Sequence, residues 1–495
     1  MERLHFATWA EQYSQKTNRS LAGSRLRVAD GMLEDSERLI AQDWGMVVSS
    51  DSPNGDVRNS GDTAARFMID ATVPVGDVAD ARELSGAEAV DFAQGHMPVL
   101  DALMRDARER VDFTGISIAV CLILEPKTAV LLRQLKAAGA KVGAYCGAEA
   151  NDERVAEQLR SEGIAVAFNP DWTPAQAHQG ALDLLDELKP NIIIDDGASF
   201  ARLAAMERPE LMANIIGVAE ETTSGVRAFQ AMQDAGALSF PVIAVNDSML
   251  KTGFDNAHGT GETCVTTMQR ILGADVFAGA KVTVVGYGPV GRGFAHRVRA
   301  LGADVTICDI DPVVSLQAVF DGFRALDIDD ALGGADMVIS ATGVRHTITL
   351  QHMQAMKPQA VLSVIGGIAN EIALDEIEDF HAEIKREIRD LSVLNGPVIR
   401  LVSEGDGVNY TVGGGNPIEI MDLSFAVQAS AVTYLLEHHG ALPHGLQRLD
   451  RSVDRHIANI ALQVRGYRAS HAVADNGYDW TLTRFAENEA ADGKE

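Results

Sequence analysis

Cysteine is scarce in this sequence, with four residues among 495. They are Cys121, Cys146, Cys264 and Cys308. No two of them stand in C-x-x-C spacing, and three lie in or at the end of apparent core strands. This pattern argues against a disulfide framework and against a zinc site. We therefore predict no metal, and we interpret the cysteines as buried thiols in a reducing cytosol.

Basic residues are outnumbered by acidic ones, 42 against 70, so the formal net charge is −28. Such an acidic surface argues against nucleic acid and anionic membranes as partners. The sequence has no run of about 18 apolar residues, so we expect no membrane span. The N-terminus, Met1–Phe6, lacks a basic region followed by an apolar one. We therefore expect no signal peptide and a cytoplasmic protein.

A glycine-rich turn between a strand and a helix is the strongest positive signal. Residues 281–285 are a β-branched run that predicts a buried strand, and residues 289–300 predict a helix. Residues 304–308 predict a second strand, which ends at Asp309. The glycines of the turn are Gly286, Gly288, Gly291 and Gly293. The first three have G-x-G-x-x-G spacing, and in this context they indicate the dinucleotide-binding fingerprint.

Each residue of this fingerprint has a physical role. Gly286 permits the tight turn, Gly288 lets a pyrophosphate approach the helix N-terminus, and Gly291 lets helix and strand pack closely. Asp309 would accept hydrogen bonds from the adenosine ribose hydroxyls, and its carboxylate would repel a 2′-phosphate. We therefore predict NAD rather than NADP as the cofactor. An ordinary glycine-rich turn is the alternative when such spacing is taken alone.

Strands and helices alternate through most of the chain, which predicts α/β architecture with parallel sheets. The strands predicted for a first domain are 117–124, 141–146, 165–168 and 191–195, and the helices are 87–110 (broken at Met97-Pro98), 128–138, 153–163 and 175–188. We expect two doubly wound, Rossmann-like domains and a mostly helical C-terminal part over 421–456. The expected boundaries are 1–74 for an N-terminal extension of unknown role, 75–250 for a substrate domain, 251–416 for an NAD-binding domain, and 417–495 for the return to the substrate domain and a helical or oligomerisation segment.

The first 74 residues are the least informative part of the sequence. Residues 25–33 and 36–41 have helical patterns, and residues 49–62 predict a polar loop, either ordered or disordered. We assign no chemistry to this segment.

Polar clusters follow several apolar strands of the first domain. Ligands of doubly wound sheets bind at the carboxyl ends of strands, which points to Asp195–Gly197, Glu220–Gly225 and Asn246–Lys251. The lysine that ends the last cluster is four residues from Asp255, so the two would pair on a helix, with Asn256 beside them. Each cluster alone also has an ordinary explanation. Asp and Asn commonly cap helices, and i,i+4 pairs are often surface contacts.

Taken together, the clusters resemble the S-adenosylhomocysteine hydrolase family. The matching stretches are Gly217–Gly225, Asn246–Asn256, the glycine loop, Asp309–Pro312 and Glu404–Asn409. The resemblance runs from about Val75 to about His456. It implies a tightly held NAD that serves as a recycled oxidant, a small-molecule nucleoside substrate and a homo-oligomer, either a dimer or a tetramer.

The resemblance also implies a mechanism and roles for named residues. The nucleoside 3′-hydroxyl is oxidised to a ketone, which acidifies the C4′ proton so that the C5′ substituent can leave by β-elimination. Lys251 would remove the 3′-hydroxyl proton, for which it needs a lowered pKa. Asp255 and Glu221 would bind the ribose hydroxyls, Asn256 would orient the lysine, and Asp196 matches the candidate base for C4′. The implied cofactor contacts are Thr222, Thr223 and Asn409, the last with the carboxamide.

The sequence departs from the family on the substrate side. Ile123 stands where the family has the histidine thought to serve the leaving group. Glu125 and Lys127 replace a Thr and a Glu that contact the ligand, and Gly367 and Asn416 replace two further histidines. We expect Glu125, Gly367 and Asn416 to contact the substrate. Glu125, expected on the same strand face as Ile123, is a candidate general acid, and simple pairing with Lys127 is the equally open alternative.

Two more departures are Thr260 in place of a cysteine and the absence of the family's Lys-Pro-x-x-Tyr tail from 481–495. The residues for 3′-oxidation and C4′ proton removal persist, which favours a changed substrate over a dead site. We expect a nucleoside other than S-adenosylhomocysteine, for example one dehydrated to a 4′,5′-unsaturated nucleoside such as angustmycin A. The alternatives are a true adenosylhomocysteinase and a non-catalytic NAD-binding regulatory paralogue.

Overall fold

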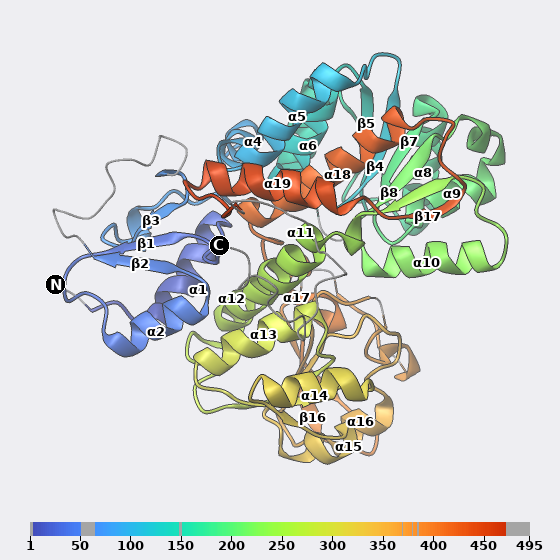
Figure 1. The fold of residues 1–495 in the computed structure, drawn as a ribbon. Coiled ribbons are helices and arrows are strands. Elements are labelled where there is room, and N and C mark those ends of the chain that lie inside the picture. Colours follow the sequence, from blue (N-terminus) through green and yellow to red (C-terminus); the bar gives the residue numbers. More distant parts are fainter. Residues whose placement is uncertain are drawn as a thin grey trace, which may run out of the picture.

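The computed structural model describes residues 3–50, 65–147, 151–368, 370–378, 380–383 and 386–471. Within these residues there are three β-sheets, one of three strands and two of seven. Figure 1 shows the small sheet near the N-terminus and helices packed around the two larger sheets. The predicted α/β class with two Rossmann-like domains is confirmed.

The first large sheet is parallel, in the order β17-β9-β8-β7-β4-β5-β6. Its strands are β4 (Ser117–Cys121), β5 (Lys141–Tyr145), β6 (Ala165–Ala167), β7 (Ile192–Asp195), β8 (Gly217–Glu220), β9 (Pro241–Ala244) and β17 (Gly445–Gln447). Helices in this part are α4 (Gly86–Gly95), α5 (Pro98–Arg110), α6 (Pro126–Ala137), α7 (Glu153–Ser161), α8 (Pro174–Leu188), α9 (Ser199–Glu207) and α10 (Thr223–Asp234). The predicted break at Met97-Pro98 separates α4 from α5. Central strands such as β7 are fully buried, as expected when helices cover both faces.

The second large sheet has the order β12-β11-β10-β13-β14-β16-β15 and is parallel except for the edge strand β15. Its strands are β10 (Lys281–Val285), β11 (Asp304–Cys308), β12 (Arg324–Ala325), β13 (Met337–Ser340), β14 (Val361–Val364), β15 (Ile388–Ser392) and β16 (Val398–Val402). Its helices include α13 (Pro289–Ala300), α14 (Pro312–Phe320), α15 (Ile328–Ala331) and α16 (Leu350–Ala355). The predicted strand–turn–helix–strand unit is therefore β10-α13-β11.

The chain crosses between the two large sheets twice. The outward path runs through α11 (Met249–Lys251), the π-helix η5 (Thr252–Thr260) and α12 (Gly261–Leu272). The return path runs through α17 (Val408–Thr411) into α18 (Ile418–Glu437), a largely buried helix that packs on α5 and on η5. Both crossings bring polar side chains to the space between the sheets.

The C-terminal part is not helical throughout. The helices α18 and α19 (Arg451–Val464) confirm most of the predicted helical region. Between them, however, β17 pairs in parallel with β9 and extends the first sheet. These residues lie within the region predicted to be mostly helical, and a strand of three residues shows no sequence periodicity that could reveal it.

The N-terminal part forms the small parallel sheet, in the order β2-β1-β3, with α1 (Phe6–Thr17) and α2 (Asp35–Asp43). The strands are β1 (Arg25–Val28), β2 (Val47–Ser50) and β3 (Met68–Asp70). The helix predicted at 36–41 is confirmed by α2. The helical pattern at 25–33 was misleading, because Leu26 and Val28 turn inward from β1 between two strand neighbours. Of the polar loop predicted at 49–62, the first two residues end β2, and 51–62 lie outside the described residues.

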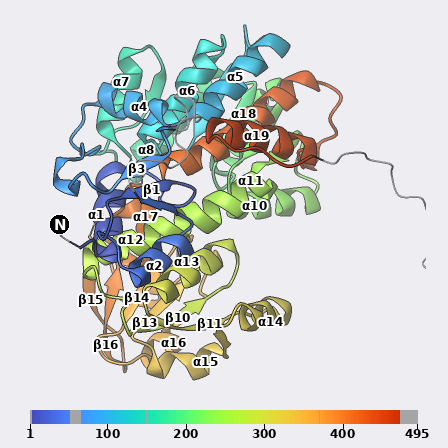
Figure 2. The same ribbon diagram turned by 60° about the vertical axis from the view of Figure 1, so that its left-hand side comes forward.

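The N-terminal part shares a hydrophobic core with the second sheet's domain. Phe6, Trp9 and Trp44 belong to the same buried cluster as Phe277 and Phe294. In Figure 2, α1 and α2 lie beside α12 and α13, close to the junction of the two larger parts. Across the described helices, none is long and apolar enough to cross a membrane.

Candidate active site

A cavity of about 720 Å³ lies between the two large sheets. From the first sheet it is lined by residues that follow β4, β5, β7, β8 and β9, and from the second by residues that follow β10, β13 and β14. The two crossing segments, which contain Lys251–Thr260 and Asn409–Asn416, complete its walls. It therefore occupies the carboxyl ends of both parallel sheets, where ligands of such sheets bind.

Lys251 is buried at the start of the π-helix, with 6% of its surface exposed. Its Nζ donates a hydrogen bond to Asn256 Oδ1 at 2.9 Å and lies 3.3 Å from Asp255 Oδ2. The i,i+4 pair is the one that the sequence predicts. A π-helix has i→i+5 hydrogen bonds and a wider turn than an α-helix, so it brings Asn256 near the side of the lysine, and such turns are frequent at functional sites.

The pKa of Lys251 does not follow the sequence expectation. Burial acts to lower it, but the nearby carboxylates of Asp255 and Glu221 outweigh burial, so the pKa is raised. The expectation of a lowered pKa was therefore wrong for this structure, because it did not count the carboxylates that converge on the amine. The lysine is held as an ammonium between these groups.

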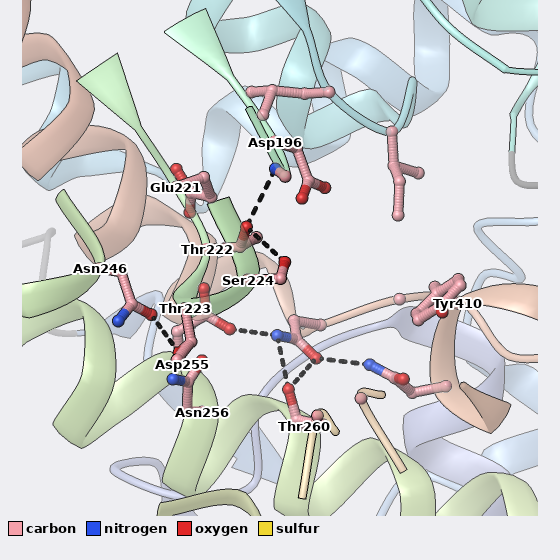
Figure 3. Close-up of a pocket in the computed structure, with 18 of the residues that line it drawn as sticks. Asp196, Glu221, Thr222, Thr223, Ser224, Asn246, Asp255, Asn256, Thr260 and Tyr410 are labelled. Atoms are coloured by element: carbon pink, nitrogen blue, oxygen red, sulfur yellow. Dashed lines mark hydrogen bonds between the residues drawn. The ribbon is translucent and has the colours of Figure 1, made fainter. Parts of the chain in front are cut away.

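Asp255 is fixed from several sides. Its Oδ2 accepts a hydrogen bond from Ser424 Oγ at 2.8 Å, and its Oδ1 accepts one from the amide of Asn416. The same amide donates to Thr260 Oγ1 at 3.2 Å, and its oxygen accepts from Asn409 Nδ2 at 3.0 Å (Figure 3). Asn416 therefore links Asp255, which we expect at the ribose of the substrate, to Asn409, which we expect at the carboxamide of NAD.

Glu221 and Asp196 place two more carboxyl groups on the cavity wall (Figure 3). Burial raises the pKa of Glu221 to about 7, while Lys251 opposes this shift. One of its oxygens accepts a hydrogen bond from Gln428, and the other has no hydrogen-bond partner among the described residues. Burial also raises the pKa of Asp196, again against the effect of Lys251.

Two fully buried carboxylates hold the loop that carries Asp196. Asp195 accepts hydrogen bonds from Phe200 N and Ala201 N at 3.1 and 2.7 Å and so satisfies two N–H groups in the first turn of α9. Glu220 accepts from Gly197 N at 3.0 Å and from Ala198 N at 2.9 Å. Sequence reasoning named the clusters that contain them but could not separate these supporting residues from the cavity-facing neighbours.

Thr222 and Thr223 differ in what they offer a ligand. Thr222 caps α10, because its Oγ1 accepts hydrogen bonds from Gly225 N at 3.2 Å and from Gly197 N at 3.0 Å. Thr223 Oγ1 donates a hydrogen bond to Asn246 Oδ1 at 3.1 Å, which connects the loops that follow β8 and β9 (Figure 3). Both line the cavity.

The four glycines of the fingerprint have different neighbours. Gly286 has φ +95°, which only glycine adopts readily. A Cβ on Gly291 would overlap the carbonyl oxygen of Gly286, and one on Gly293 would overlap the carbonyl oxygen of Ala257 in the π-helix. A Cβ on Gly288 would meet no protein atom within 4 Å, because this residue faces the cavity.

The second sheet positions two further carboxylates. Asp309, at the end of β11, accepts hydrogen bonds from Tyr287 N at 2.8 Å and Asp311 N at 2.9 Å. Glu371 is fully buried and accepts from Ser340 Oγ at 2.6 Å and Thr342 N at 2.7 Å, which fixes the loop after β13. The sequence analysis missed Glu371. A charged residue between Ile368 and the apolar run Ile372–Leu374 was the available signal.

The structure also places the residues that differ from the family on the substrate side. The strand β4 ends at Cys121, and Glu125 is the residue before α6, so our placement of Glu125 on a strand face with Ile123 was wrong. Its pairing with Lys127 is confirmed, with 2.7 Å between Oε2 and Nζ. The cavity wall includes Ile123, Glu125, Gly367 and Asn416. Gly367 has no room for a side chain, because a Cβ would overlap Glu371.

Comparison with known proteins decides the family. The model of S-adenosyl-L-homocysteine hydrolase matches residues 74–209, and the model of that family's NAD-binding domain matches residues 256–415. The chain belongs to the S-adenosyl-L-homocysteine hydrolase family. The resemblance stated from the sequence is thereby confirmed, and the family is one of NAD-dependent hydrolases.

Curated members of the hydrolase family match along most of their length. The S-inosyl-L-homocysteine hydrolase of Methanopyrus kandleri is 38% identical over 387 residues, which cover 77% of this chain and 91% of the relative. The adenosylhomocysteinase of Thermococcus kodakarensis is 40% identical over 388 residues, covering 78% and 92%. That of Thermoplasma volcanium is 37% identical over 392 residues, covering 78% and 94%.

NAD is the cofactor of this hydrolase family member, and the residues present fit it. Gly288 leaves open space at the N-terminus of α13, where a pyrophosphate gains most from the backbone N–H groups. Asn409 Oδ1 is buried without a hydrogen-bond partner among the described residues, so it is free to accept one from a carboxamide. Asp309 lies at the end of the second strand of the fingerprint, where the ribose hydroxyls would be bound.

Replacing Asp309 with alanine should weaken NAD binding by about tenfold, the effect of losing one hydrogen bond to a charged group. It should also narrow the preference for NAD over NADP, because the carboxylate that repels a 2′-phosphate is removed. Titration of both cofactors into protein stripped of NAD measures the two affinities. Asp311→Ala is the matched control, since Asp311 caps α14 two residues further on. An unchanged preference in Asp309→Ala would mean that Asp309 does not contact the ribose.

Proposed function

We propose that this protein uses bound NAD to oxidise the 3′-hydroxyl of a nucleoside, removes the C4′ proton and eliminates the C5′ substituent. We further propose that its substrate is a nucleoside other than S-adenosylhomocysteine. One observation carries the proposal. The groups for 3′-oxidation converge on one cavity, while the substrate side of the same cavity has Ile123, Glu125 and Asn416 where the family has other residues.

We assign to Lys251 the removal of the proton from the 3′-hydroxyl. Asn256 and Asp255 hold its amine at 2.9 and 3.3 Å, so its position is fixed before substrate enters. Asp255 and Glu221 present carboxylate oxygens to the same space and would accept hydrogen bonds from the ribose hydroxyls. Because the pKa of Lys251 is raised, the ammonium must lose its proton before the amine acts as a base. When bound, NAD supplies the acceptor for the hydrogen and electron pair that leave C3′.

We assign to Asp196 the removal of the proton from C4′. The C3′ ketone acidifies this proton, and a carboxylate whose pKa burial has raised is a stronger base than an exposed one. As Asp196 takes the proton, the C4′–H electron pair forms the C4′=C5′ double bond and the C5′ substituent leaves with its own bonding pair. A hydrolase then adds water to this bond, whereas a dehydratase releases the unsaturated product once C3′ is reduced again.

The substrate side of the cavity favours a changed specificity. Ile123 can neither donate nor accept a proton, and Gly367 has no side chain. Neither residue of the cavity wall can therefore give a proton to a leaving group. Glu125 is the carboxyl group that remains on this wall, and burial raises its pKa against the effect of Lys127. A C5′ hydroxyl that leaves as water needs a proton, which Glu125 in its acid form would supply. Dehydration to a 4′,5′-unsaturated nucleoside of the angustmycin A type is therefore our preferred example.

A second candidate function is hydrolysis of S-adenosylhomocysteine itself. Membership of the family favours it, and the relatives from Thermococcus and Thermoplasma are named adenosylhomocysteinases. The Methanopyrus relative is named for S-inosyl-L-homocysteine, so a thioether with another base is a third possibility. We also propose, as the sequence resemblance implies, a cytoplasmic homo-oligomer, either a dimer or a tetramer; light scattering would test the oligomeric state.

A panel of substrates separates these functions. Purified NAD-loaded protein is given adenosine, inosine, S-adenosylhomocysteine and S-inosylhomocysteine, and products are followed by mass spectrometry. We expect loss of water from a nucleoside with a free 5′-hydroxyl, with kcat/KM at least about 100-fold above that for S-adenosylhomocysteine, as for sites built around different polar groups. Glu125→Gln should lower this dehydration. Efficient release of homocysteine from either thioether would contradict the proposed change of substrate.

A further inference from the structure

The N-terminal part, which precedes the residues matched by the family model, reaches the wall of the cavity. The residue that does so is Asn18, the left-handed residue that ends α1, with φ 52°. Its Nδ2 donates hydrogen bonds to Gly414 O at 2.9 Å and to Gly415 O at 3.1 Å. Its own carbonyl oxygen accepts from Ile418 N at 3.0 Å. One asparagine therefore holds both the return segment 413–417 and the first residue of α18.

Asn18 also contacts the substrate-side ion pair. Its Oδ1 accepts a hydrogen bond at 2.8 Å from Lys127 Nζ, which is almost fully buried. The same Nζ donates to Asn416 O at 2.7 Å and Gly414 O at 3.1 Å and pairs with Glu125 at 2.7 Å. Every partner of this ammonium is thus an oxygen of the N-terminal part, the return segment or Glu125. Lys127 is not on the cavity wall, whereas Glu125 is.

The residues after Asn18 lock it in this position. Arg19 forms a buried ion pair with Glu419, whose second oxygen accepts a hydrogen bond from Ser20 N at 2.9 Å. Leu21 N and Ala22 N donate to the two oxygens of Glu262 on α12 at 2.8 and 3.0 Å. The loop is therefore attached to α18 on one side and to α12 on the other. Both helices belong to the crossings that wall the cavity.

Glu125 itself depends on this arrangement. Gly415 has φ +67°, and a Cβ on it would overlap Glu125 Oε1, so the carboxylate packs directly on the return segment. Its other oxygen is held by Lys127. If the segment or the lysine moves, the carboxylate moves with it.

We propose that Asn18 is a positioning residue of the substrate site, through which the N-terminal part fixes Lys127, the return segment 413–417 and hence Glu125. The N-terminal part thereby sets specificity for substrates that form a hydrogen bond with the carboxyl group of Glu125 at this wall. This inference rests on the proposed function for its kinetic consequence, while its structural consequence is independent of the substrate.

The test compares three variants of the full-length NAD-loaded protein. Asn18→Gly removes the side chain and keeps a residue that adopts positive φ without strain. Asn18→Asp keeps the acceptor for Lys127 but loses the donors to the return segment. Gln15→Ala is the control, because Gln15 on the same helix α1 donates only to Thr266 and Thr267 of α12. Thermal unfolding of each variant shows that it is folded.

Two readouts are measured. We expect faster amide hydrogen exchange in peptides covering 413–418 in Asn18→Gly, a smaller increase in Asn18→Asp and none in Gln15→Ala. For the panel nucleoside that the wild type converts fastest, kcat/KM should fall at least about tenfold in Asn18→Gly, the effect of one or two ordinary hydrogen bonds, with KM rising and kcat falling because Glu125 is the proposed proton donor. Exchange and kcat/KM in Asn18→Gly equal to those of Gln15→Ala would overturn the inference. If no nucleoside is converted, the proposed function fails, and the exchange result alone still decides the role of Asn18.

Discussion

Replacing Lys251 with methionine should slow oxidation of the nucleoside 3′-hydroxyl by between about two and four orders of magnitude, the range expected when a positioned acid–base group is lost. The reason is geometric. The amine lies against Asn256 and Asp255 on a π-helix, and no other described lysine lines the cavity. Methionine keeps an unbranched apolar side chain of nearly the same length and removes the amine, with its positive charge and its contacts to Asn256 and Asp255. Absorbance at 340 nm after rapid mixing of NAD-loaded protein with adenosine or inosine measures this step directly.

The matched control for Lys251 is Asn256→Ala. It keeps the amine and removes the 2.9 Å hydrogen bond that orients it, so we expect a smaller loss of about 10- to 100-fold. Both variants should keep NAD, because neither residue belongs to the glycine-rich turn. A Lys251→Met protein that forms NADH within about threefold of the wild-type rate would remove the lysine from the mechanism.

Two alanine substitutions in the glycine-rich turn should differ in their effect on stability. Gly291→Ala should lower the melting temperature by roughly 2–10 °C, because a Cβ there overlaps Gly286 O and overpacking costs about 1–3 kcal/mol. Gly288→Ala should leave the melting temperature of the NAD-free protein unchanged, because its Cβ meets no protein atom. The methyl group of the new alanine would instead enter the cavity where the pyrophosphate of NAD would approach. The affinity of Gly288→Ala for NAD should therefore fall at least about tenfold.

Thermal unfolding with and without added NAD, together with the NAD content of the purified proteins, separates the two glycines. We expect Gly288→Ala to fold normally and purify without NAD. A Gly288→Ala protein that retains NAD at the wild-type level would show that the cofactor's pyrophosphate does not approach the N-terminus of α13. Equal destabilisation by both substitutions would show that Gly288 is restricted by packing rather than by the cofactor.

The features that the sequence predicted well are those set by local chemistry. The unit β10-α13-β11 was predicted because a β-branched run, three spaced glycines and a terminal Asp309 each meet a local constraint. The pair of Lys251 and Asp255 was predicted from its spacing alone. The contact with Asn256 has a different origin, since it depends on a widened helical turn that hydrophobic periodicity does not reveal.

The features that the sequence did not predict depend on partners far along the chain. The strand β1 exists because β2 and β3 flank it, and Glu371 acts through the backbone of a loop nearly 30 residues away. On α18, Ser424 and Gln428 hold the carboxylates of Asp255 and Glu221. Both are polar residues within the long, largely apolar run of α18, which was a usable signal. The sequence carried no such signal for Asn18, because its role depends on the contact between the end of α1 and the return segment 413–417.

Deuterium uptake at C4′ is the measurement that tests the central claim most directly. Adenosine and inosine are incubated in D₂O with the NAD-loaded wild type and with Lys251→Met, and each recovered nucleoside is analysed by mass spectrometry and proton NMR. Exchange requires a ketone at C3′ and a base at C4′, so it reports 3′-oxidation and proton removal whichever group leaves C5′. We predict loss of the C4′ proton signal in at least one nucleoside with the wild type and retention of that signal with Lys251→Met. No exchange with any of them, despite bound NAD, would contradict the account and favour a non-catalytic NAD-binding regulator.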